Sequence, residues 1–244
     1  MKLPFLLTTL AGISTLIGFL FIYVKGKKEK IIASSLSFAA GVMITLSIFD
    51  LIPEALKEIR YFNSFFPSFL IVLIGINLGI IISSNLEKKV KKSSNSSLYK
   101  IGLTSMLAIV LHNIPEGIAT YLTSTNNIKL GIKLTLAIAL HNIPEGIAIA
   151  IPIYYSTNSK NKSFIYTLIS GLSEIVGAVL AFLFLKDIMN SLYMGFLYSV
   201  VAGIMLTLSI KELIIEALKK ETLKSNLIFY IIGSILMIIS IILI

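Results

Sequence analysis

Hydrophobic residues fall into eight long runs along the chain, and short polar joints separate the runs. A helix of about 20 apolar residues crosses a hydrocarbon core of about 30 Å, and each run is close to that length. The pattern therefore predicts an all-α membrane protein with eight transmembrane helices, forming a single transmembrane domain over residues 1–244. The predicted helices span residues 4–24, 32–54, 66–84, 101–123, 130–152, 164–185, 192–215 and 226–244.

The composition agrees with this pattern, because 56% of the residues are hydrophobic and only 14% are charged. In a typical soluble domain, charged residues make up about 25% of the chain. The formal net charge of +9 would suggest a nucleic-acid partner in a soluble protein, but here the charges lie in the joints, so we expect no nucleic acid. The chain has no cysteine, which excludes disulfides and thiolate metal sites and leaves nitrogen and oxygen as metal ligands.

Lysine and arginine collect in alternate joints, which carry 15 of the 21 cationic residues. These are Lys25, Lys27, Lys28, Lys30, Lys88, Lys89, Lys91, Lys92, Lys100, Lys160, Lys162, Lys211, Lys219, Lys220 and Lys224. Cytoplasmic loops carry such an excess, so we predict a multi-pass protein of the cell (cytoplasmic) membrane with both termini outside the cytoplasm. The longest cytoplasmic joint, residues 85–100, is rich in Lys and Ser and is predicted to be a flexible linker.

Two sequence repeats relate helices that cross the membrane in opposite directions. Residues 107–120 recur at 136–149 with two differences, and residues 40–57 match residues 202–219. A fainter match links Gly12, Ser14 and Gly18 to Gly171, Ser173 and Gly177. Such matching is typical of inverted repeats in transporters, so we expect a 3+2+3 bundle in which the first three helices mirror the last three. Duplication for packing alone is the alternative.

Each copy of the 107–120 repeat contains the motif His-Asn-Ile-Pro-Glu-Gly, and these motifs hold both histidines of the chain. His112 and Glu116 are four residues apart and share a helix face, as do His141 and Glu145. Each histidine lies about 21 Å along its helix from the joint between the two helices, near the bilayer midplane. Because the helices are antiparallel, the four side chains are expected to form a ladder of ligands across the membrane.

Ionised carboxylates at this depth cost roughly 2.5–3.5 kcal/mol each, and a divalent cation would offset that cost. Imidazole, carboxylate and amide ligands suit Zn, Fe, Mn or Co and argue against Mg and Ca. Glu174 is a further candidate ligand, and the alternative for it is an interhelical hydrogen bond of the protonated acid. The candidate metal ligands are His112, Asn113, Glu116, His141, Asn142, Glu145 and Glu174.

Four other carboxylates lie near the ends of the second and seventh helices. Asp50 and Glu54 lie at the predicted outer side, where they would attract cations into a vestibule or simply be solvated. Glu212 and Glu216 occupy the corresponding inner positions and are candidates for lining an exit. Asn77, in the third helix, is predicted to make a helix–helix hydrogen bond.

The paired motifs, with Ile-Pro-Ile-Tyr-Tyr at 151–155 and Ser-Gly-Leu-Ser-Glu at 170–174, resemble the ZIP (Zrt-, Irt-like) family of divalent metal transporters over nearly the whole chain. The resemblance implies a binuclear site near mid-membrane and uptake of Zn²⁺ as cargo, with tolerance for Fe²⁺, Mn²⁺ and Co²⁺. It also implies an elevator-like motion of the first, fourth, fifth and sixth helices against the others.

Carried onto this chain, the resemblance implies a zinc site of Glu116, His141 and Glu145, with His112 close by. It implies a neighbouring site made of Asn113, Glu116, Asn142, Glu145 and Glu174. Glu116 and Glu145, which belong to both sets, would bridge the two metals.

Two other classes of protein stay open from the residues. An intramembrane metal-dependent hydrolase would use His and Glu beside a metal to activate water, but the spacing differs from the His-Glu-x-x-His of common metalloproteases. A proton- or sodium-coupled carrier of an organic cargo is disfavoured by the histidine pair. We therefore expect a transporter and not an enzyme. The residues do not rank Zn over Fe or Mn, and helix faces rich in Gly and Ser would permit a homodimer.

Overall fold

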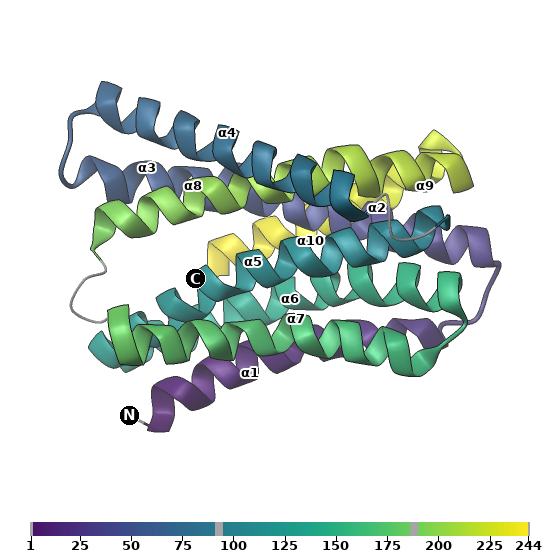
Figure 1. Cartoon of the computed structure of the whole chain (residues 1–244), viewed down its shortest axis with the longest axis horizontal. Coiled ribbons are helices and arrows are strands. Elements are labelled where there is room, and N and C mark those ends of the chain that lie inside the picture. The colour runs from purple at the N-terminus through teal and green to yellow at the C-terminus, as the bar shows by residue number, and fades with distance from the viewer. Residues whose placement is uncertain (1, 91–94, 186–189, 244) are drawn as a thin grey trace.

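The computed structural model describes residues 2–90, 95–185 and 190–243, and every regular element within them is helical. In chain order these elements are α1 (Lys2–Phe19), η1 (Leu20–Tyr23), α2 (Lys28–Leu46), η2 (Ser47–Leu51), α3 (Ile52–Arg60), α4 (Phe65–Val90), α5 (Ser97–Asn126), α6 (Ile128–Thr157), α7 (Lys160–Leu180), η3 (Ala181–Leu185), α8 (Ser191–Leu208), η4 (Ser209–Ile214), α9 (Ile215–Lys220) and α10 (Leu223–Leu243). Consecutive elements join into eight helices that are long and apolar enough to cross a membrane. They run along the long axis of the molecule, so the predicted eight-helix fold is confirmed (Figure 1).

The membrane helices extend beyond the hydrophobic runs that predict them. The second run, residues 32–54, becomes a helix over Lys28–Arg60. The flexible linker predicted for residues 85–100 is wrong at both ends, because α4 continues to Val90 and α5 begins at Ser97. The side chain of Ser96 caps α5 by accepting a hydrogen bond from the Tyr99 backbone N–H. Polar residues thus continue and cap helices past the apolar stretch, which hydropathy alone does not reveal.

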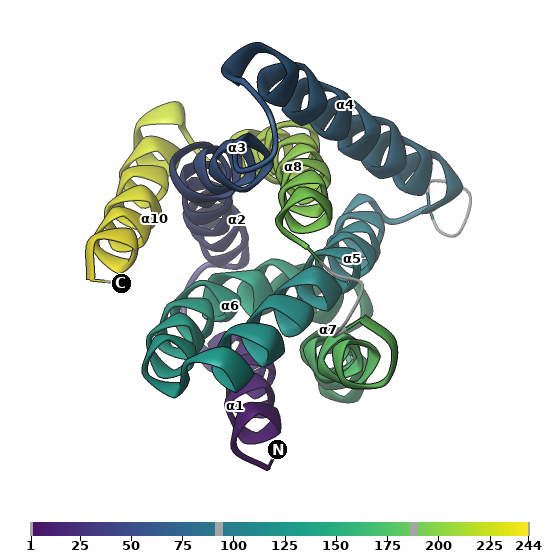
Figure 2. The same ribbon diagram turned by 90° about the vertical axis from the view of Figure 1, so that its left-hand side faces the viewer.

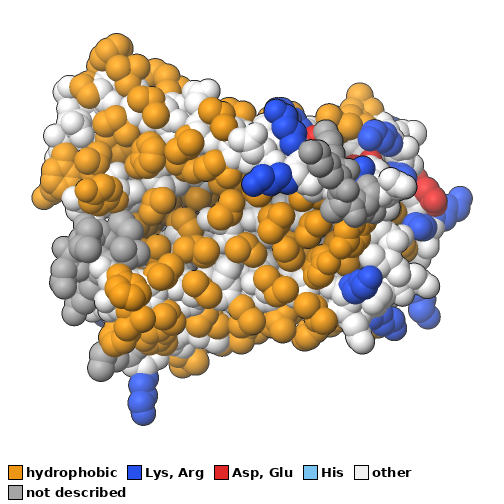
Figure 3. Space-filling view, viewed as in Figure 1, with side chains coloured by type: hydrophobic (Ala, Val, Ile, Leu, Met, Phe, Trp, Pro, Cys, Tyr) orange, Lys and Arg blue, Asp and Glu red, His pale blue; other side chains and the backbone are white. Residues whose placement is uncertain are grey.

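The surface separates into an apolar band and a cationic end. Hydrophobic side chains cover the long sides of the molecule, and on the face shown Lys and Arg gather mainly at the end that carries α9 (Figure 3). Of the cations counted in the sequence, Lys91, Lys92 and Lys186 lie outside the described residues.

The helices form two groups, which an end-on view separates (Figure 2). In the first helix group, α1, α5, α6 and α7 pack chiefly against one another. In the second helix group, α2 and α10 pack together and α8 packs against α3 and α4. A hydrophobic cluster fills the space between the groups and includes Ile109 and Ile147 from the first and Met43 and Met205 from the second.

Glycines let helices within each group approach closely. A Cβ atom added to Gly12 of α1 would overlap the carbonyl oxygen of Gly171 in α7, and one added to Gly171 would overlap the carbonyl oxygen of Gly12. Three pairs of repeat-related glycines make matching contacts with backbone carbonyls of a neighbouring helix. Gly117 lies against the Glu174 carbonyl and Gly146 against the Thr15 carbonyl, and Gly177 lies against the Ile114 carbonyl and Gly18 against the Ile143 carbonyl. In the second helix group, Gly41 lies against the Tyr230 carbonyl and Gly203 against the Ile76 carbonyl. Each of these close approaches joins two helices of the same group.

Replacing Gly12 with alanine should destabilise the first helix group. The added Cβ would push the Gly171 carbonyl away, and overpacking of this kind typically costs about 1–3 kcal/mol. The midpoint of thermal unfolding in detergent should therefore fall. Gly26→Ala is the matched control, because the nearest atom to its added Cβ is 3.5 Å away. Equal unfolding midpoints for the two variants would show that α1 and α7 can move apart to accommodate the added methyl group with no loss of stability.

Candidate metal centre

The two histidine motifs face each other because α5 and α6 form a tight hairpin. Asn127 alone joins the two helices, and its side-chain oxygen caps α6 by accepting hydrogen bonds from the backbone N–H groups of Lys129 and Leu130. The imidazole centroids of His112 and His141 lie 6.2 Å apart. The hairpin therefore brings the two motifs together near the middle of two 30-residue helices.

His112, Glu116 and His141 form a compact buried cluster. The Oε1 atom of Glu116 lies 3.0 Å from His141 Nε2 and 3.2 Å from His112 Nε2. One ligand atom from each of the three residues lies within 4.8 Å of the others. Glu145 joins the cluster from the other motif, with its Oε1 atom 3.2 Å from His112 Nε2. The His and Glu side chains that were expected to form a ladder across the membrane thus form one compact cluster.

The two asparagines of the motifs are held in equivalent ways. Asn113 Nδ2 donates to the Ser170 carbonyl of α7 over 3.0 Å, and Asn142 Nδ2 donates to the Ala11 carbonyl of α1 over the same distance. Both Oδ1 atoms are buried and have no hydrogen-bond partner in the described chain. Because the nitrogen of each amide is occupied, each oxygen is left free to act as a ligand.

Glu174 lies beside these amides rather than among the histidines. It is fully buried, and its Oε1 atom accepts a hydrogen bond from Asn142 Nδ2, while its Oε2 atom has no hydrogen-bond partner among the described residues. The close approach of Gly117 to the Glu174 backbone draws α7 against α5 at this level. Glu174 therefore extends the cluster toward α7 with one free carboxylate oxygen.

The carboxylates of the cluster lack basic partners. Within the described residues, Glu116 and Glu145 contact histidine and Glu174 contacts asparagine, and none of the three pairs with Lys or Arg. Buried carboxylates without a counter-ion are costly, and unbonded oxygens add to that cost. A divalent ion held by imidazole, carboxylate and amide groups would supply the missing positive charge.

A cavity of about 440 Å³ leads to the cluster from the end of the molecule opposite α9. Its wall includes Glu116 and His141, together with Asp50 and Glu54, the two carboxylates predicted to line a vestibule. We refer to it as the Asp50 cavity. Glu54 also pairs with Lys57 over 2.9 Å, so part of its charge is already balanced.

The other residues that line the Asp50 cavity include Glu58 and Tyr198, which sequence reasoning did not single out. Glu58 follows Glu54 by four residues, so the helical period of the acidic residues was a usable signal. Tyr198 comes from α8, and its place opposite the carboxylates depends on the packing of the two groups.

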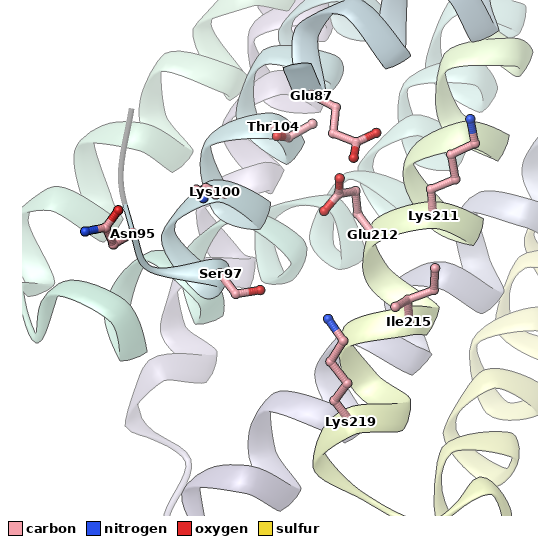
Figure 4. Close-up of a pocket in the computed structure, with 9 residues that line it drawn as sticks. All are labelled: Glu87, Asn95, Ser97, Lys100, Thr104, Lys211, Glu212, Ile215 and Lys219. Atoms are coloured by element: carbon pink, nitrogen blue, oxygen red, sulfur yellow. The ribbon is translucent and has the colours of Figure 1, made fainter. Parts of the chain in front are cut away.

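A second pocket, of about 600 Å³, lies at the α9 end and is lined by Glu212 (Figure 4). We refer to it as the Glu212 pocket. The carboxylates of Glu87 and Glu212 point toward one another across it, with Lys211 and Lys219 on its wall (Figure 4). Glu87 was overlooked because its joint was predicted to be a loop. None of the candidate metal ligands in α5, α6 and α7 lines this pocket.

Glu216, the other carboxylate predicted for the exit, is held in a different setting. It is 2% exposed and accepts a hydrogen bond from Ser97 Oγ over 3.1 Å. Lys219 and Lys220 lie 3.3 and 3.5 Å from its oxygens. Glu216 thus connects the start of α5 to α9, and Glu212 is the one of the two that lines the pocket.

A π-helical turn interrupts the second and the seventh membrane helices at repeat-related positions. The turn η2 covers Ser47–Leu51 and the turn η4 covers Ser209–Ile214. Such turns are rare and frequently mark functional sites. Asp50 belongs to the first and Glu212 to the second, so each turn supplies an acidic residue to the wall of one hollow.

Fold and site together define a multi-pass membrane protein that buries a cluster of side chains able to hold a metal ion, and a cavity borders this cluster. Similarity to known proteins identifies the class more closely. A family profile described as "ZIP Zinc transporter" matches residues 82–241. The chain therefore belongs to the ZIP family of zinc transporters, and it is a protein of the cell membrane.

Similar proteins cover almost the whole chain. A protein of Streptococcus mutans named zinc transporter ZupT is 37% identical over 257 positions, which cover 98% of this chain and 96% of the relative. Its namesake in Oceanobacillus iheyensis is 36% identical over 263 positions, with coverage of 100% and 98%. The corresponding protein of Enterobacter sp. is 38% identical over 221 positions, with coverage of 87% and 86%.

Proposed function

We propose that the protein carries Zn²⁺ across the cell membrane into the cell, and that His112, Glu116, His141 and Glu145 bind the ion on its way. The main support is the cluster of His112, Glu116 and His141, whose ligand atoms lie within 4.8 Å of one another and which borders the Asp50 cavity. The names of the relatives support zinc as the cargo. No observation favours the alternative of a metal-dependent hydrolase.

A second metal position would lie beside the first. Its ligands would be the free oxygens of Asn113, Asn142 and Glu174, together with Glu116 and Glu145, which would bridge the two ions. In support, one oxygen of each of these three residues is buried without a hydrogen-bond partner in the described chain. Oxygen-rich ligand sets of this kind suit harder divalent ions than the histidine pair does.

The transported ions would include Fe²⁺, Mn²⁺ and Co²⁺ as well as Zn²⁺, and would exclude Mg²⁺ and Ca²⁺. In proteoliposomes loaded with a zinc-sensitive dye, roughly tenfold excess of Fe²⁺, Mn²⁺ or Co²⁺ should at least halve zinc entry, because imidazole and carboxylate ligands bind all of these ions. The same excess of Mg²⁺ or Ca²⁺ should leave zinc entry unchanged. Equal inhibition by Mg²⁺ and Mn²⁺ would argue against a transport site that contains histidine.

Transport would proceed by alternating access within an inverted repeat. The repeat is supported by matching contacts, such as Gly117 with the Glu174 carbonyl and Gly146 with the Thr15 carbonyl. The same glycines support a mechanism in which each helix group moves as a rigid body, because the close contacts of these glycines join helices within one group. The metal cluster belongs to the first helix group, which would carry the ion past the second.

Both termini would lie outside the cytoplasm. This orientation is supported by the cations at the α9 end, since cytoplasmic loops carry the excess of Lys and Arg. The Asp50 cavity would then open to the outside and the Glu212 pocket to the cytoplasm. Asp50 and Glu54 would draw cations in, and Glu212 would line the route of release.

A further inference from the structure

Six exposed lysines come together at the α9 end of the molecule, in two stretches that cover residues 25–30 and 160–162. The first stretch joins α1 to α2, and the second begins α7. Two contacts hold these joints beside each other. The Nζ atom of Lys160 lies 4.7 Å from the ring centroid of Tyr23, and Lys28 Nζ donates to the Tyr155 carbonyl over 3.2 Å. We refer to the surface as the lysine patch, which consists of Lys25, Lys27, Lys28, Lys30, Lys160 and Lys162.

The positive charge of the lysine patch is not balanced within the described residues. None of its six ammonium groups makes an ion pair there, and Glu29 is the one acidic residue in the two stretches. By contrast, Lys219 and Lys220 at the same end lie 3.3 and 3.5 Å from oxygens of Glu216. Membrane topology accounts for an excess of cations at one end of the molecule. It does not require two separate joints to gather unpaired lysines on one surface, where like charges repel.

A row of aromatic rings lies beside the lysine patch. The ring centroid of Phe19 lies 6.1 Å from that of Tyr23 and 5.4 Å from that of Phe164. Tyr23 and Phe164 are exposed, at 54% and 39%. Aromatic rings with one apolar side and one polar neighbour are typical of the membrane–water interface. The lysine patch therefore lies at the level of the lipid headgroups.

We propose that the lysine patch binds anionic phospholipids of the leaflet at the α9 end. The lipid phosphates would lie against the ammonium groups, and the acyl chains would follow the aromatic row into the apolar band. Each lysine near an anionic membrane surface strengthens such binding about fivefold. A soluble anion would meet the same ammonium groups but would gain nothing from the rings. This inference does not rest on the proposed transport activity.

A single introduced tryptophan tests the proposal, because the chain has no tryptophan of its own. Phe164→Trp lies beside the lysine patch. Ile239→Trp is the matched reference, because it is 50% exposed and α10 has no Lys or Arg after Lys224. In vesicles of phosphatidylglycerol and phosphatidylcholine, quenching by a brominated form of either lipid gives their relative binding constant at each position. Phosphatidylglycerol should be favoured at least about fivefold at Phe164→Trp, and the two lipids should bind about equally at Ile239→Trp. Equal values at the two positions would overturn the proposal.

Charge removal tests whether the lysines cause the preference. In the Phe164→Trp protein, the patch variant carries three further substitutions: Lys25→Gln, Lys160→Gln and Lys162→Gln. The control variant loses the same charge from exposed lysines outside the patch: Lys88→Gln, Lys89→Gln and Lys224→Gln. The preference for phosphatidylglycerol should fall at least about fivefold in the patch variant and stay unchanged in the control variant. A preference that survives in the patch variant, or that falls equally in both, would overturn the proposal.

Inorganic phosphate distinguishes a lipid site from a site for a soluble anion. Replacing sodium chloride with sodium phosphate at equal ionic strength should leave the lipid preference at Phe164→Trp unchanged. Raising the ionic strength from about 0.1 M to about 1 M should weaken it, because the Debye length falls from about 10 Å to about 3 Å. A preference lost in phosphate at equal ionic strength would assign the patch to a soluble anion, and one that ignores ionic strength would exclude the lysines as its cause. Either result would overturn the lipid site.

Discussion

Zinc uptake into proteoliposomes is expected to fall by at least about 100-fold when Glu116 is replaced with glutamine. Loss of an outer-shell partner of a metal ligand already costs about 10- to 100-fold, so loss of a ligand should cost at least as much. The Glu116 Oε1 atom lies within 3.2 Å of both histidine Nε2 atoms, so no other carboxylate oxygen has the same position. Glutamine keeps the size of the side chain and removes its negative charge.

Glu29→Gln is the matched control for this experiment. Glu29 lies exposed in the first turn of α2, far from the cluster, and its neutralisation should leave uptake at the wild-type rate. Thermal unfolding of both variants in detergent checks that each is folded. Wild-type uptake by a folded Glu116→Gln variant would show that the cluster does not bind the transported ion.

The second large effect is expected from a link between the two helix groups at the α9 end. Ser97 Oγ of α5 donates to Glu216 of α9 over 3.1 Å, and Lys28 Nζ of α2 donates to the Tyr155 carbonyl of α6 over 3.2 Å. Because α9 continues the membrane helix of α8, a member of the second helix group, both hydrogen bonds join the first helix group to the second. Movement of one group past the other would have to break them, whereas the Asp50 cavity is open at the other end.

A short bis-methanethiosulfonate reagent applied to the Ser97→Cys plus Glu216→Cys variant should reduce zinc uptake to that of empty liposomes. Bound zinc, measured on the cross-linked protein in detergent, should stay near the wild-type amount, because the cluster borders the open Asp50 cavity. Dithiothreitol should restore uptake. The chain has no other cysteine to react.

A pair within one group provides the control. The hydroxyl groups of Tyr99 in α5 and Tyr166 in α7 lie 2.8 Å apart, and both helices belong to the first helix group. Cross-linking Tyr99→Cys plus Tyr166→Cys should leave uptake unchanged by the reagent. Full uptake by the cross-linked Ser97 and Glu216 pair would show that the groups do not separate at the α9 end.

The sequence predicts which side chains come together at the centre of the candidate site, because the geometry of the two motifs is local. His112 and Glu116 share a face by helical spacing alone, as do His141 and Glu145. The hairpin at Asn127 then allows one arrangement of the two faces, with the motifs opposed at the same depth. Eight hydrophobic runs of membrane length fix the number of helices for an equally local reason.

The surroundings of the site depend on which helices are neighbours, and the sequence predicts this poorly. Asn113 bonds to the Ser170 carbonyl and Asn142 to the Ala11 carbonyl only because α7 and α1 flank the hairpin. A helix that is apolar on all sides carries no hydrophobic period to show which face meets another helix. Asn77 shows the same difficulty, because a helix–helix hydrogen bond was predicted for it, whereas its side chain is exposed and donates to the Leu73 carbonyl of its own helix.

The glycine contacts that hold each helix group together also bear on the membrane around the protein. The first helix group carries its own outward apolar side chains, such as Leu6, Leu10 and Ile17 of α1. If this group travels as one body, its apolar band shifts relative to the edges of the hydrocarbon layer. Mismatch of this kind costs fractions of a kcal/mol per Å. Bilayer thickness would then shift the equilibrium between the outward-open and inward-open states. Lipid composition would thereby change the rate of transport without any change at the metal site.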